Sequence, residues 1–289
     1  MILMDDVYLA FDVGGTSIKS ALIKNDFTII DRNSVKTNRN LNNEIIDYLT
    51  DTASRYQHLY HVVGIGVSTA GIVDQTGTIR YAGPTISNYQ GTAIKSTLET
   101  KTNLPVNVVN DVDAALLGEL LAGSAKDTTS AYCIALGTGI GGAFAINGKL
   151  YSGAHNNANS IGYTRFQPQT DTYFEQRAAT LTLDTELAKL NVSVKDGFNL
   201  AKNGRQPYLH IIENWINQIA TGIADILLVL DPEVLIIGGA VAQQGNYLLK
   251  LLNRALTVYI PADLFQTDLK TSKLANDAQL LGAISSFLK

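Results

Sequence analysis

The alternation of hydrophobic and polar residues predicts β-strands at the start of each half of the chain. Near the N-terminus, the runs VYLAFDV and SIKSALI stand on either side of two glycines, which favours an antiparallel hairpin. The segment AYCIALGTGIGGAFAINGKLYSG repeats this order of strand, glycine-rich turn and strand about half the chain further on. Two such hairpins indicate a fold made of two related lobes.

Helical spacing of apolar residues follows each hairpin. In NNEIIDYLTDTASRYQ, the side chains of Ile45, Leu49 and Ala53 fall on one helical face. Residues 209–230 carry apolar side chains at three- and four-residue steps, which predicts a long buried helix. Strand-like runs such as VVGIGVST and EVLIIGG come after the helical segments, so the chain returns to strands after each helix.

Composition limits the classes of protein that the chain can belong to. It has 289 residues, 46% hydrophobic and 17% charged, so it can bury a large core in one long domain or two lobes. A formal charge of −4 without long single-sign runs gives no electrostatic footprint for nucleic acid or a membrane surface. Neither a signal peptide nor an apolar run near the roughly 18 residues of a membrane span is evident, so we expect a cytoplasmic protein. The single cysteine, Cys133, cannot form a disulfide or multi-thiolate metal site within one chain and is predicted to be a core residue.

The first glycine turn, DVGGT at residues 12–16, has the composition of an anion-binding turn. It matches neither a P-loop nor a GxGxxG dinucleotide turn, because a strand is predicted after it. The backbone N–H groups of Gly14 and Gly15 can converge on phosphate oxygens, and Thr16 adds a hydroxyl. The alternative is a tight turn without a ligand. A second turn, GTGIGG at residues 137–142, and a Gly-Gly pair at a later strand end favour a ligand, since β-turn geometry does not require so many glycines.

Four segments in order carry a family resemblance over nearly the whole chain. FDVGGTSIKSALI, VNDVDAALLGEL, ALGTGIGGAFAINGKLYSGA and EVLIIGGAVA resemble the phosphate-1, connect-1, phosphate-2 and adenosine motifs of ROK-family sugar kinases, in the hexokinase/actin/Hsp70 superfamily. The resemblance implies an α/β, two-lobed actin-like ATPase fold of the ribonuclease H-like type, with the active site in the interlobe cleft. It also implies an N-terminal lobe of residues 1–111 plus about 277–289, and a C-terminal lobe of about 112–276.

The resemblance gives roles to the polar residues of the first lobe. Asp111 of VVND matches the catalytic base, because a carboxylate in hydrogen-bond reach can accept the proton of a sugar hydroxyl as the γ-phosphoryl group of ATP is transferred. An N-cap of the following helix is the alternative role of Asp111. Asn110 matches a ligand of a sugar hydroxyl. Asp12 matches the carboxylate that positions Mg²⁺, through water, since Mg²⁺ keeps much of its hydration.

The resemblance also implies the ATP contacts. The positions that match the two phosphate clamps and the adenosine contact are Gly14, Gly15, Thr16, Gly137, Thr138, Gly139, Gly238 and Gly239. Lys19, on the strand after the first turn, could reach a phosphate, and a solvated strand lysine is the alternative.

The chain departs from the family on the sugar side. After the second hairpin the family reads G-A-x-G-A-A-G-E-I-G-H and continues into a cysteine-rich zinc loop, whereas this chain reads GAHNNANSIGYTRF and QPQTDTYF. Ser160 stands at the Glu position and Tyr163 at the His position, which alters the hydrogen bonds near the anomeric end of the sugar. We expect no zinc, because a structural zinc needs about four N or S ligands that this region cannot supply.

Three further segments are expected to contribute sugar contacts. TYFEQRAAT resembles the family's L-E-x-Y-A-S stretch and makes Glu175 a sugar-binding carboxylate, with a surface Glu paired with Arg177 as the alternative. GPTISNYQGTAI resembles a P-N-L-x-G-W segment, with Thr85 in place of Asn and Tyr89 in place of Trp. Tyr89 could stack on a sugar or be a half-buried loop aromatic. Gly71 of STAG is also expected to line the pocket.

Together these features predict an ATP- and Mg²⁺-dependent, glucokinase-like sugar kinase that phosphorylates a primary hydroxyl, O6 of glucose or of a glucose-like unit. A β-glucoside or disaccharide and N-acetylmannosamine stay open as substrates because the anomeric side is altered. A catalytically weak sugar-binding regulator is the second class of hypothesis. The family's repressors carry a helix-turn-helix before the first turn, and a turn that begins by Asp12 leads us to expect no DNA-binding domain. The family also implies a homodimer without nucleic-acid or membrane partners.

Overall fold

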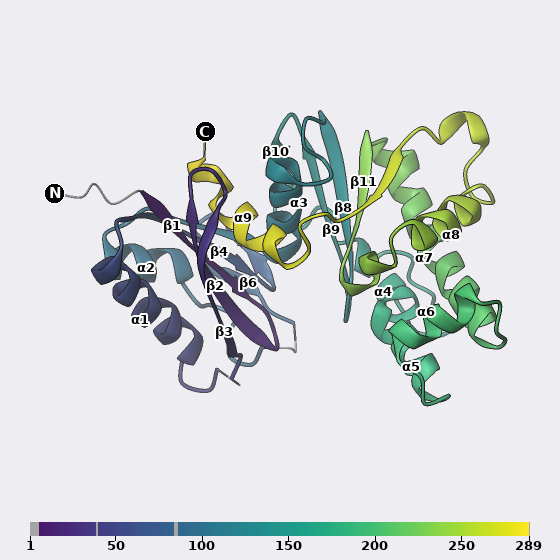
Figure 1. Ribbon diagram of the computed structural model, residues 1–289, viewed down its shortest axis with the longest axis horizontal. Coiled ribbons are helices and arrows are strands. Elements are labelled where there is room, and N and C mark those ends of the chain that lie inside the picture. Colours follow the sequence, from purple (N-terminus) through teal and green to yellow (C-terminus); the bar gives the residue numbers. More distant parts are fainter. Residues whose placement is uncertain (1–5, 39, 84–85, 289) are drawn as a thin grey trace. The chain divides into compact units, whose positions relative to one another are not determined.

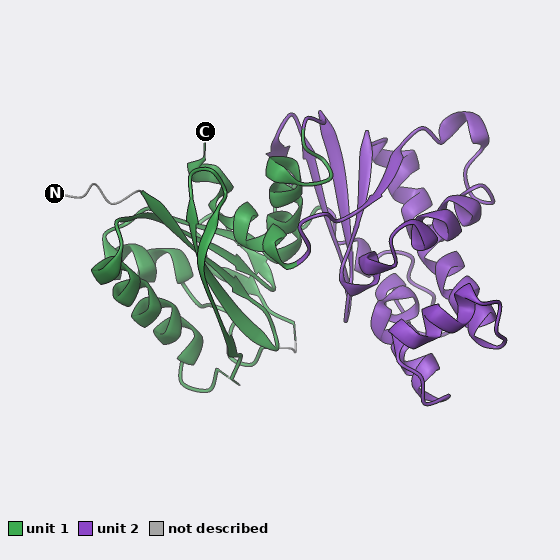
Figure 2. Cartoon of the chain, viewed as in Figure 1, with its two compact units in different colours: residues 1–126, 152–158, 276–289 green, residues 127–151, 159–275 purple. Residues whose placement is uncertain are grey.

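The computed structural model describes residues 6–38, 40–83 and 86–288 and divides into two compact units (Figure 2). Unit 1 consists of Met1–Lys126, Ser152–Ala158 and Asn276–Lys289, and unit 2 of Asp127–Tyr151 and Asn159–Ala275. Unit 1 therefore extends beyond Asp111, where the sequence led us to divide the chain. Within the described residues, no helix combines the length and the apolar character needed to cross a membrane.

Unit 1 is a mixed sheet with helices on both faces (Figure 1). Its strands run in the order β3-β2-β1-β4-β7. Its main elements are β1 (Val7–Val13), β2 (Ser17–Lys24), β3 (Ile29–Lys36), α1 (Glu44–Leu59), β4 (Val62–Thr69), α2 (Ile94–Thr102), β7 (Val106–Asn110), α3 (Asp111–Ala122) and α9 (Ala278–Ile284). A small separate ribbon is formed by β5 (Ile72–Val73) and β6 (Ile79–Tyr81).

Unit 2 repeats this plan with a second sheet and more helices. Its strands run in the order β10-β9-β8-β11-β12. Its main elements are β8 (Ser130–Leu136), β9 (Ile140–Ile146), β10 (Lys149–Leu150), α4 (Phe174–Ala178), α5 (Thr180–Ala188), α6 (Val194–Lys202), α7 (Tyr208–Leu230), β11 (Val234–Gly238), α8 (Asn246–Leu256) and β12 (Asp268–Thr271). Its short 3₁₀ turns are η1 (Ile161–Tyr163), η2 (Ala240–Gln244) and η3 (Ala262–Leu264), whereas η4 (Ala275–Asp277) begins at the last residue of unit 2 and η5 (Ser285–Phe287) belongs to unit 1.

The two sheets share one topology. In each, the central strand pairs antiparallel with the next strand along the chain and parallel with a later one: β1 with β2 and β4, and β8 with β9 and β11. Both glycine turns join the antiparallel pair, because each stands between the first two strands of its sheet. The predicted hairpins and the two related lobes are thus confirmed.

Hydrophobic side chains at the predicted spacings build a core in each unit. In unit 1, Ile45, Leu49 and Ala53 of α1 pack on the sheet. In unit 2, α7 carries the buried face that the apolar steps of 209–230 predicted, and the indole N–H of Trp215 donates to the carbonyl of Ala178 at 3.0 Å. Cys133 is buried, as its apolar surroundings predicted.

Helix α9 returns to unit 1 and packs closely against β4 and α3. The approach depends on three glycines, because a Cβ on Gly66, Gly118 or Gly282 would clash with backbone atoms of the facing segment. Those facing atoms belong to Ala283, Ala278 and Ala114, respectively. Helix α3 is therefore bound to unit 1 through α9, which explains why the unit does not end at Asp111.

Candidate active site

Asp12 stands near the end of β1, where both neighbouring strands supply it with a partner. The register sets Asp12 opposite Lys19 of β2 and Ser68 of β4. Ser68 Oγ donates to Asp12 Oδ1 at 3.0 Å, and Lys19 Nζ donates to Asp12 Oδ2 at 3.2 Å. With 8% of its surface exposed, Asp12 is a nearly buried carboxylate whose orientation is fixed by a hydroxyl and an ammonium group.

Asn110 and Asp111 occupy the junction of β7 and α3. The side chain of Asn110 caps the helix: its Oδ1 accepts from the N–H groups of Val112 at 2.9 Å and Asp113 at 3.4 Å. Its Nδ2 donates to the carbonyl of Gly71 at 2.8 Å. Because Asn110 is the cap, the alternative reading of Asp111 as the cap is wrong. Asp111 is the first residue of the helix, and its carboxylate accepts from the N–H of Val112 at 3.0 Å.

The carboxylates of this junction have perturbed pKa values. Burial, together with the negative charge of Asp12, raises the pKa of Asp111 from 3.8 to about 6. Burial and the charge of Asp111 likewise raise the pKa of Asp113 to about 6. A carboxyl group with such a pKa is ionised at neutral pH and still close enough to it to exchange a proton, which is the property of a general base.

The first glycine turn presents two uncommitted backbone donors. The N–H of Gly14 donates to Ser17 O at 3.0 Å, and the hydroxyl of Thr37 donates to Gly14 O at 2.6 Å. The N–H groups of Gly15 and Thr16 have no hydrogen-bond partner in the described part of the chain, and both residues are exposed. Adjacent free N–H groups in a tight turn are the donors that an anion requires.

The second glycine turn has the same property. The N–H of Gly137 donates to Gly139 O at 3.0 Å, and the N–H of Leu181 donates to Gly137 O at 3.2 Å. Among residues 6–38, 40–83 and 86–288, the N–H groups of Thr138 and Gly139 find no partner. The turn is thus anchored at its base and open at its tip.

Gly238 and Gly239 end β11 beside this turn. Gly238 is buried, whereas Gly239 is exposed. Gly239 has a φ of 90°, and a Cβ there would clash with the carbonyl oxygen of Leu136, the last residue of β8. No other residue type fits this position without strain.

Glu175 joins the second turn to η1. Its Oε2 accepts from the N–H of Ile140 at 3.2 Å. A Cβ on Gly139 would stand 2.6 Å from that oxygen, and a Cβ on Gly162 would stand 2.9 Å from it. The carboxylate therefore lies against both segments, and it does not form the pair with Arg177 that was its alternative role, because Arg177 donates to backbone carbonyls instead.

The other predicted sugar contacts lie in varied surroundings. Ser160 is exposed and precedes η1, and Tyr163 of η1 is 53% exposed. Gly71 has a φ of 97° and supplies the carbonyl that Asn110 binds. Tyr89 is 1% exposed and its hydroxyl lies 2.6 Å from Thr69 Oγ1, so its ring belongs to the core and presents no open face for stacking. Thr85 lies outside the described residues.

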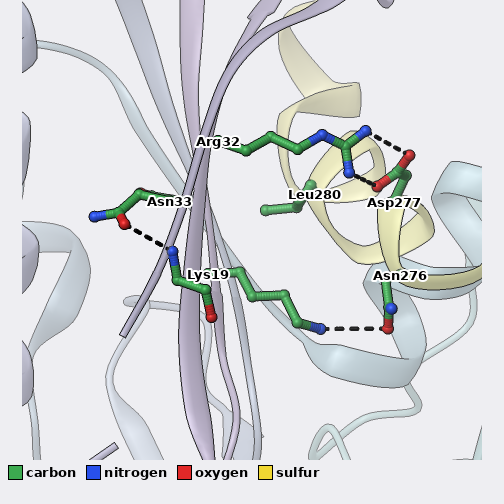
Figure 3. Close-up of a pocket in the computed structure, with 8 residues that line it drawn as sticks. Lys19, Arg32, Asn33, Asn276, Asp277 and Leu280 are labelled. Carbon is green, nitrogen blue, oxygen red and sulfur yellow. Dashed lines mark hydrogen bonds and ion pairs between the residues drawn. The ribbon is translucent and has the colours of Figure 1, made fainter. Parts of the chain in front are cut away.

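A groove of about 370 Å³ runs along unit 1 beside Lys19 (Figure 3). Lys19 Nζ donates to Asn276 Oδ1 at 3.4 Å, and Arg32 pairs with Asp277 through two bonds of 2.6 and 2.8 Å. Of the residues that the motifs singled out, the groove includes Lys19 alone. These bonds connect Asn276 and Asp277, the two residues before α9, to the hairpin of β2 and β3.

Two interactions within the site were not predicted from the sequence: the ion pair of Lys19 with Asp12 and the helix cap formed by Asn110. The Lys19–Asp12 pair could have been found, because an antiparallel hairpin with this turn sets those residues opposite each other. The position of Asn110 directly before a helix indicated a cap, but the family resemblance assigned Asn110 to the sugar instead. In the described residues, no three His, Cys, Asp or Glu side chains converge closely enough to hold a metal ion, so any metal at Asp12 would depend on water and ligand oxygens.

The strand order, the paired glycine turns and the carboxylates define a class of protein: this is the actin-like ATPase fold, as in solved ROK hexokinases. The chain belongs to the ROK family, whose family model matches residues 8–289.

Named relatives of the chain include sugar kinases. A glucokinase of Halalkalibacterium halodurans is 27% identical over 96% of this chain and 94% of its own. A beta-glucoside kinase of Listeria monocytogenes is 28% identical over 97% of both chains. A ROK family protein from Streptococcus pneumoniae, solved in complex with sucrose, is 26% identical, covers 98% of both chains and gives a TM-score of 0.85.

Proposed function

We propose that the protein is an ATP-dependent sugar kinase that transfers the γ-phosphoryl group to a primary hydroxyl of a glucose-like sugar. The observation that carries the proposal is the carboxylate pair of unit 1. Asp12 is held in place by Ser68 and Lys19, and its charge helps to raise the pKa of Asp111 to about 6. Membership of the ROK family and the sugar-kinase relatives support the same conclusion.

Asp111 is the general base in this proposal. A sugar hydroxyl is a weak nucleophile, and an ionised carboxylate that accepts its proton typically raises the rate by about 10²–10⁴-fold. Asp111 is well suited because it belongs to the first turn of α3, where Asn110 and not Asp111 caps the helix. Its carboxylate is thereby left to face a substrate hydroxyl, while the neighbouring Asn110 amide orients the sugar.

The residues present fit ATP and Mg²⁺. The uncommitted N–H groups of Gly15 and Thr16 in unit 1, and of Thr138 and Gly139 in unit 2, are the donors that a polyphosphate chain requires. Asp12 would hold Mg²⁺ through water. When bound, ATP with Mg²⁺ supplies the phosphoryl group and balances its charge.

Gly137, Gly238 and Gly239 would complete the contacts with the nucleotide. Gly137 anchors the second turn through the N–H of Leu181, and the positive-φ backbone of Gly239 lies beside the end of β8. The absence of side chains at these positions allows a ligand to approach the backbone closely.

For the sugar we infer glucose or a glucoside as substrate, with O6 as the acceptor. Glu175 and the exposed residues Ser160 and Tyr163 would serve the anomeric side. A neutral hydroxyl in place of a charged acceptor weakens the binding of a free anomeric hydroxyl and leaves room for a substituent there. Thr85 keeps its predicted contact as a hypothesis, and N-acetylmannosamine stays an alternative substrate.

A panel of sugars tests the proposal. ADP release would be followed with ATP and Mg²⁺ in the presence of glucose, mannose, N-acetylmannosamine, cellobiose and sucrose, for the wild type and for Asp111→Asn. We expect turnover with at least one glucose-containing sugar and its loss by at least about 10²-fold in the variant. Tight sugar binding without turnover would contradict the kinase and favour a regulator. Turnover of the variant within a few-fold of wild type would contradict the role of Asp111.

A further inference from the structure

Three aromatic side chains form an exposed cluster in unit 2, after the proposed sugar segment. Tyr163, Phe166 and Tyr173 are 53%, 46% and 39% exposed. The rings of Tyr163 and Tyr173 meet edge to face with centroids 5.8 Å apart, and those of Phe166 and Tyr173 are tilted with centroids 5.0 Å apart. Three large aromatic side chains that pack on one another and still face solvent form an apolar patch of the kind that binds a ligand.

The backbone under this aromatic cluster is held in a defined shape. Residues 167–172 form a tight hairpin in which Gln167 N–H donates to Thr172 O at 2.8 Å. Arg165, just before it, has a φ of 54°, a conformation that residues other than glycine rarely adopt. Phe166 and Tyr173 flank the hairpin, so its shape sets the distance between their rings.

The guanidinium of Arg177 maintains this shape. Its Nη1 donates to Thr172 O at 2.7 Å, to Thr172 Oγ1 at 2.9 Å and to Tyr173 O at 3.0 Å. Its Nη2 donates to Arg165 O at 2.6 Å. The planar fork of one side chain therefore connects both ends of the hairpin, which a lysine could not do.

The bonds between Arg177 and the hairpin carry a desolvation cost. Its Nε is buried, and within the described residues it has no hydrogen-bond partner and no carboxylate forms an ion pair with Arg177. Burial and the nearby charge of Arg165 lower the pKa of Arg177. A half-buried guanidinium whose Nε has no partner, and whose other donors bind only backbone carbonyls and a hydroxyl, costs free energy, which indicates that the shape of the cluster matters.

The aromatic cluster is continuous with the sugar segment. Tyr163 is the last residue of η1, whose Gly162 packs against the carboxylate of Glu175. One member of the cluster thus belongs to the segment that packs on the carboxylate which the proposed function assigns to the sugar. If the first sugar ring of a substrate binds at Glu175, a group attached to that ring could contact the aromatic cluster.

The surroundings of the aromatic cluster are polar and mostly neutral. Gln167, Gln169 and Thr170 are exposed, Arg165 pairs with Asp225 at 2.7 Å, and Asp171 adds an exposed carboxylate to the hairpin. Amide and hydroxyl groups both donate and accept hydrogen bonds, as sugar hydroxyls require. Flat aromatic faces match the apolar faces of a pyranose ring. A polyhydroxylated, uncharged ligand fits this set better than an ion or an extended apolar chain.

We propose that the aromatic cluster of Tyr163, Phe166 and Tyr173, held by Arg177, binds the second sugar ring of a glycoside whose first ring is phosphorylated. This inference rests on the proposed kinase function and deepens it, since it makes a disaccharide such as a β-linked glucoside the preferred substrate class over free glucose.

The test compares glucose with cellobiose. Phe166→Ala and Tyr173→Ala remove side chains that lie outside the hydrophobic core of unit 2 and are 46% and 39% exposed, so both variants should fold, which thermal denaturation checks. Loss of one stacking partner should lower kcat/KM for cellobiose by up to about tenfold and leave that for glucose within about twofold. Tyr259→Ala is the matched control, because Tyr259 is also 39% exposed in unit 2 but lies outside the aromatic cluster.

Calorimetric titration separates this inference from the proposed function. Cellobiose binding that weakens in Tyr173→Ala but not in Tyr259→Ala supports the second-ring site, even if no sugar is phosphorylated. Absence of phosphorylation would contradict only the proposed kinase function. Equal losses for glucose and cellobiose in the two cluster variants would overturn the inference. It would also be overturned if the wild type phosphorylated glucose but neither bound nor phosphorylated cellobiose.

Discussion

Replacing Asp111 by Asn should make the protein more stable above pH 6 while removing its activity. The carboxylate is half-buried near the charge of Asp12, and both effects penalise its ionised form. Asn has nearly the same shape and keeps an oxygen that can accept the N–H of Val112, which Asp111 binds at 3.0 Å. The substitution therefore removes a charge and leaves the local packing unchanged.

The magnitude follows from the pKa of Asp111. The difference between its ordinary value of 3.8 and about 6 in the folded protein corresponds to about 3 kcal/mol of destabilisation when the group is ionised in both states. Because the folded state binds this proton more tightly than the unfolded chain, the stability of the wild type falls as the pH rises from about 4 to 6. Asp111→Asn avoids that loss, so its advantage is full above pH 6 and fades towards pH 4.

Thermal denaturation between pH 4 and pH 8, without nucleotide or divalent metal, measures the effect. At pH 8 the midpoint of Asp111→Asn should lie several degrees above that of the wild type, at about 2–4 °C for each kcal/mol. Asp51→Asn, at an exposed position of α1, is the control and should change little at any pH. A gain that is absent at pH 8, or that is the same at pH 4, would refute the reasoning.

Three further predictions concern the same machinery. In pH profiles of kcat/KM for the sugar, activity should fall about tenfold per pH unit below an inflection between about pH 4 and pH 6. The upper limit is the pKa of Asp111, which a bound cation would lower towards its ordinary value of 3.8. A profile flat down to pH 4 would contradict Asp111 as the base. Asn110→Ala should lose about 1–2 kcal/mol in urea unfolding and raise the KM for the sugar, whereas Ser193→Ala, which removes the cap of α6, should lose stability without a change in KM. Arg177→Lys should lower kcat/KM for cellobiose more than for glucose, because an ammonium group cannot replace the bonds to Arg165, Thr172 and Tyr173; an equal fall for both sugars would reduce Arg177 to a structural residue.

Local patterns predicted the main elements of the fold, whereas the fold class came from the family resemblance. The turn of DVGGT between two apolar runs predicted the β1–β2 hairpin, and its repetition in GTGIGG predicted that the second sheet has the same plan. Apolar steps along residues 209–230 predicted α7. These features depend on residues close in the sequence, whose periodicity and turn chemistry are readable without tertiary information.

Contacts between distant segments were harder to predict. Nothing near Tyr89 indicates that its hydroxyl meets Thr69 in the core, and nothing near Arg177 indicates that its partners are carbonyls of a preceding loop. The position of Glu175 beside Ile140 is of the same kind. Every residue offers the same backbone N–H and carbonyl groups, and side chains distant in sequence meet only through the fold, so such partners emerge only when the chain is folded.

Helix α9 affects the order in which the protein can be completed during synthesis. Unit 1 begins with the first strands made, yet the helix that packs against Gly66 and Gly118 belongs to its last segment, 276–289. Every residue of unit 2 is made before that segment. During translation, the surfaces of α3 and of the first sheet that α9 covers therefore stay exposed until residues 276–289 have been made, after all of unit 2. A nascent chain of this kind exposes apolar surface for most of its translation and depends on a late closing step.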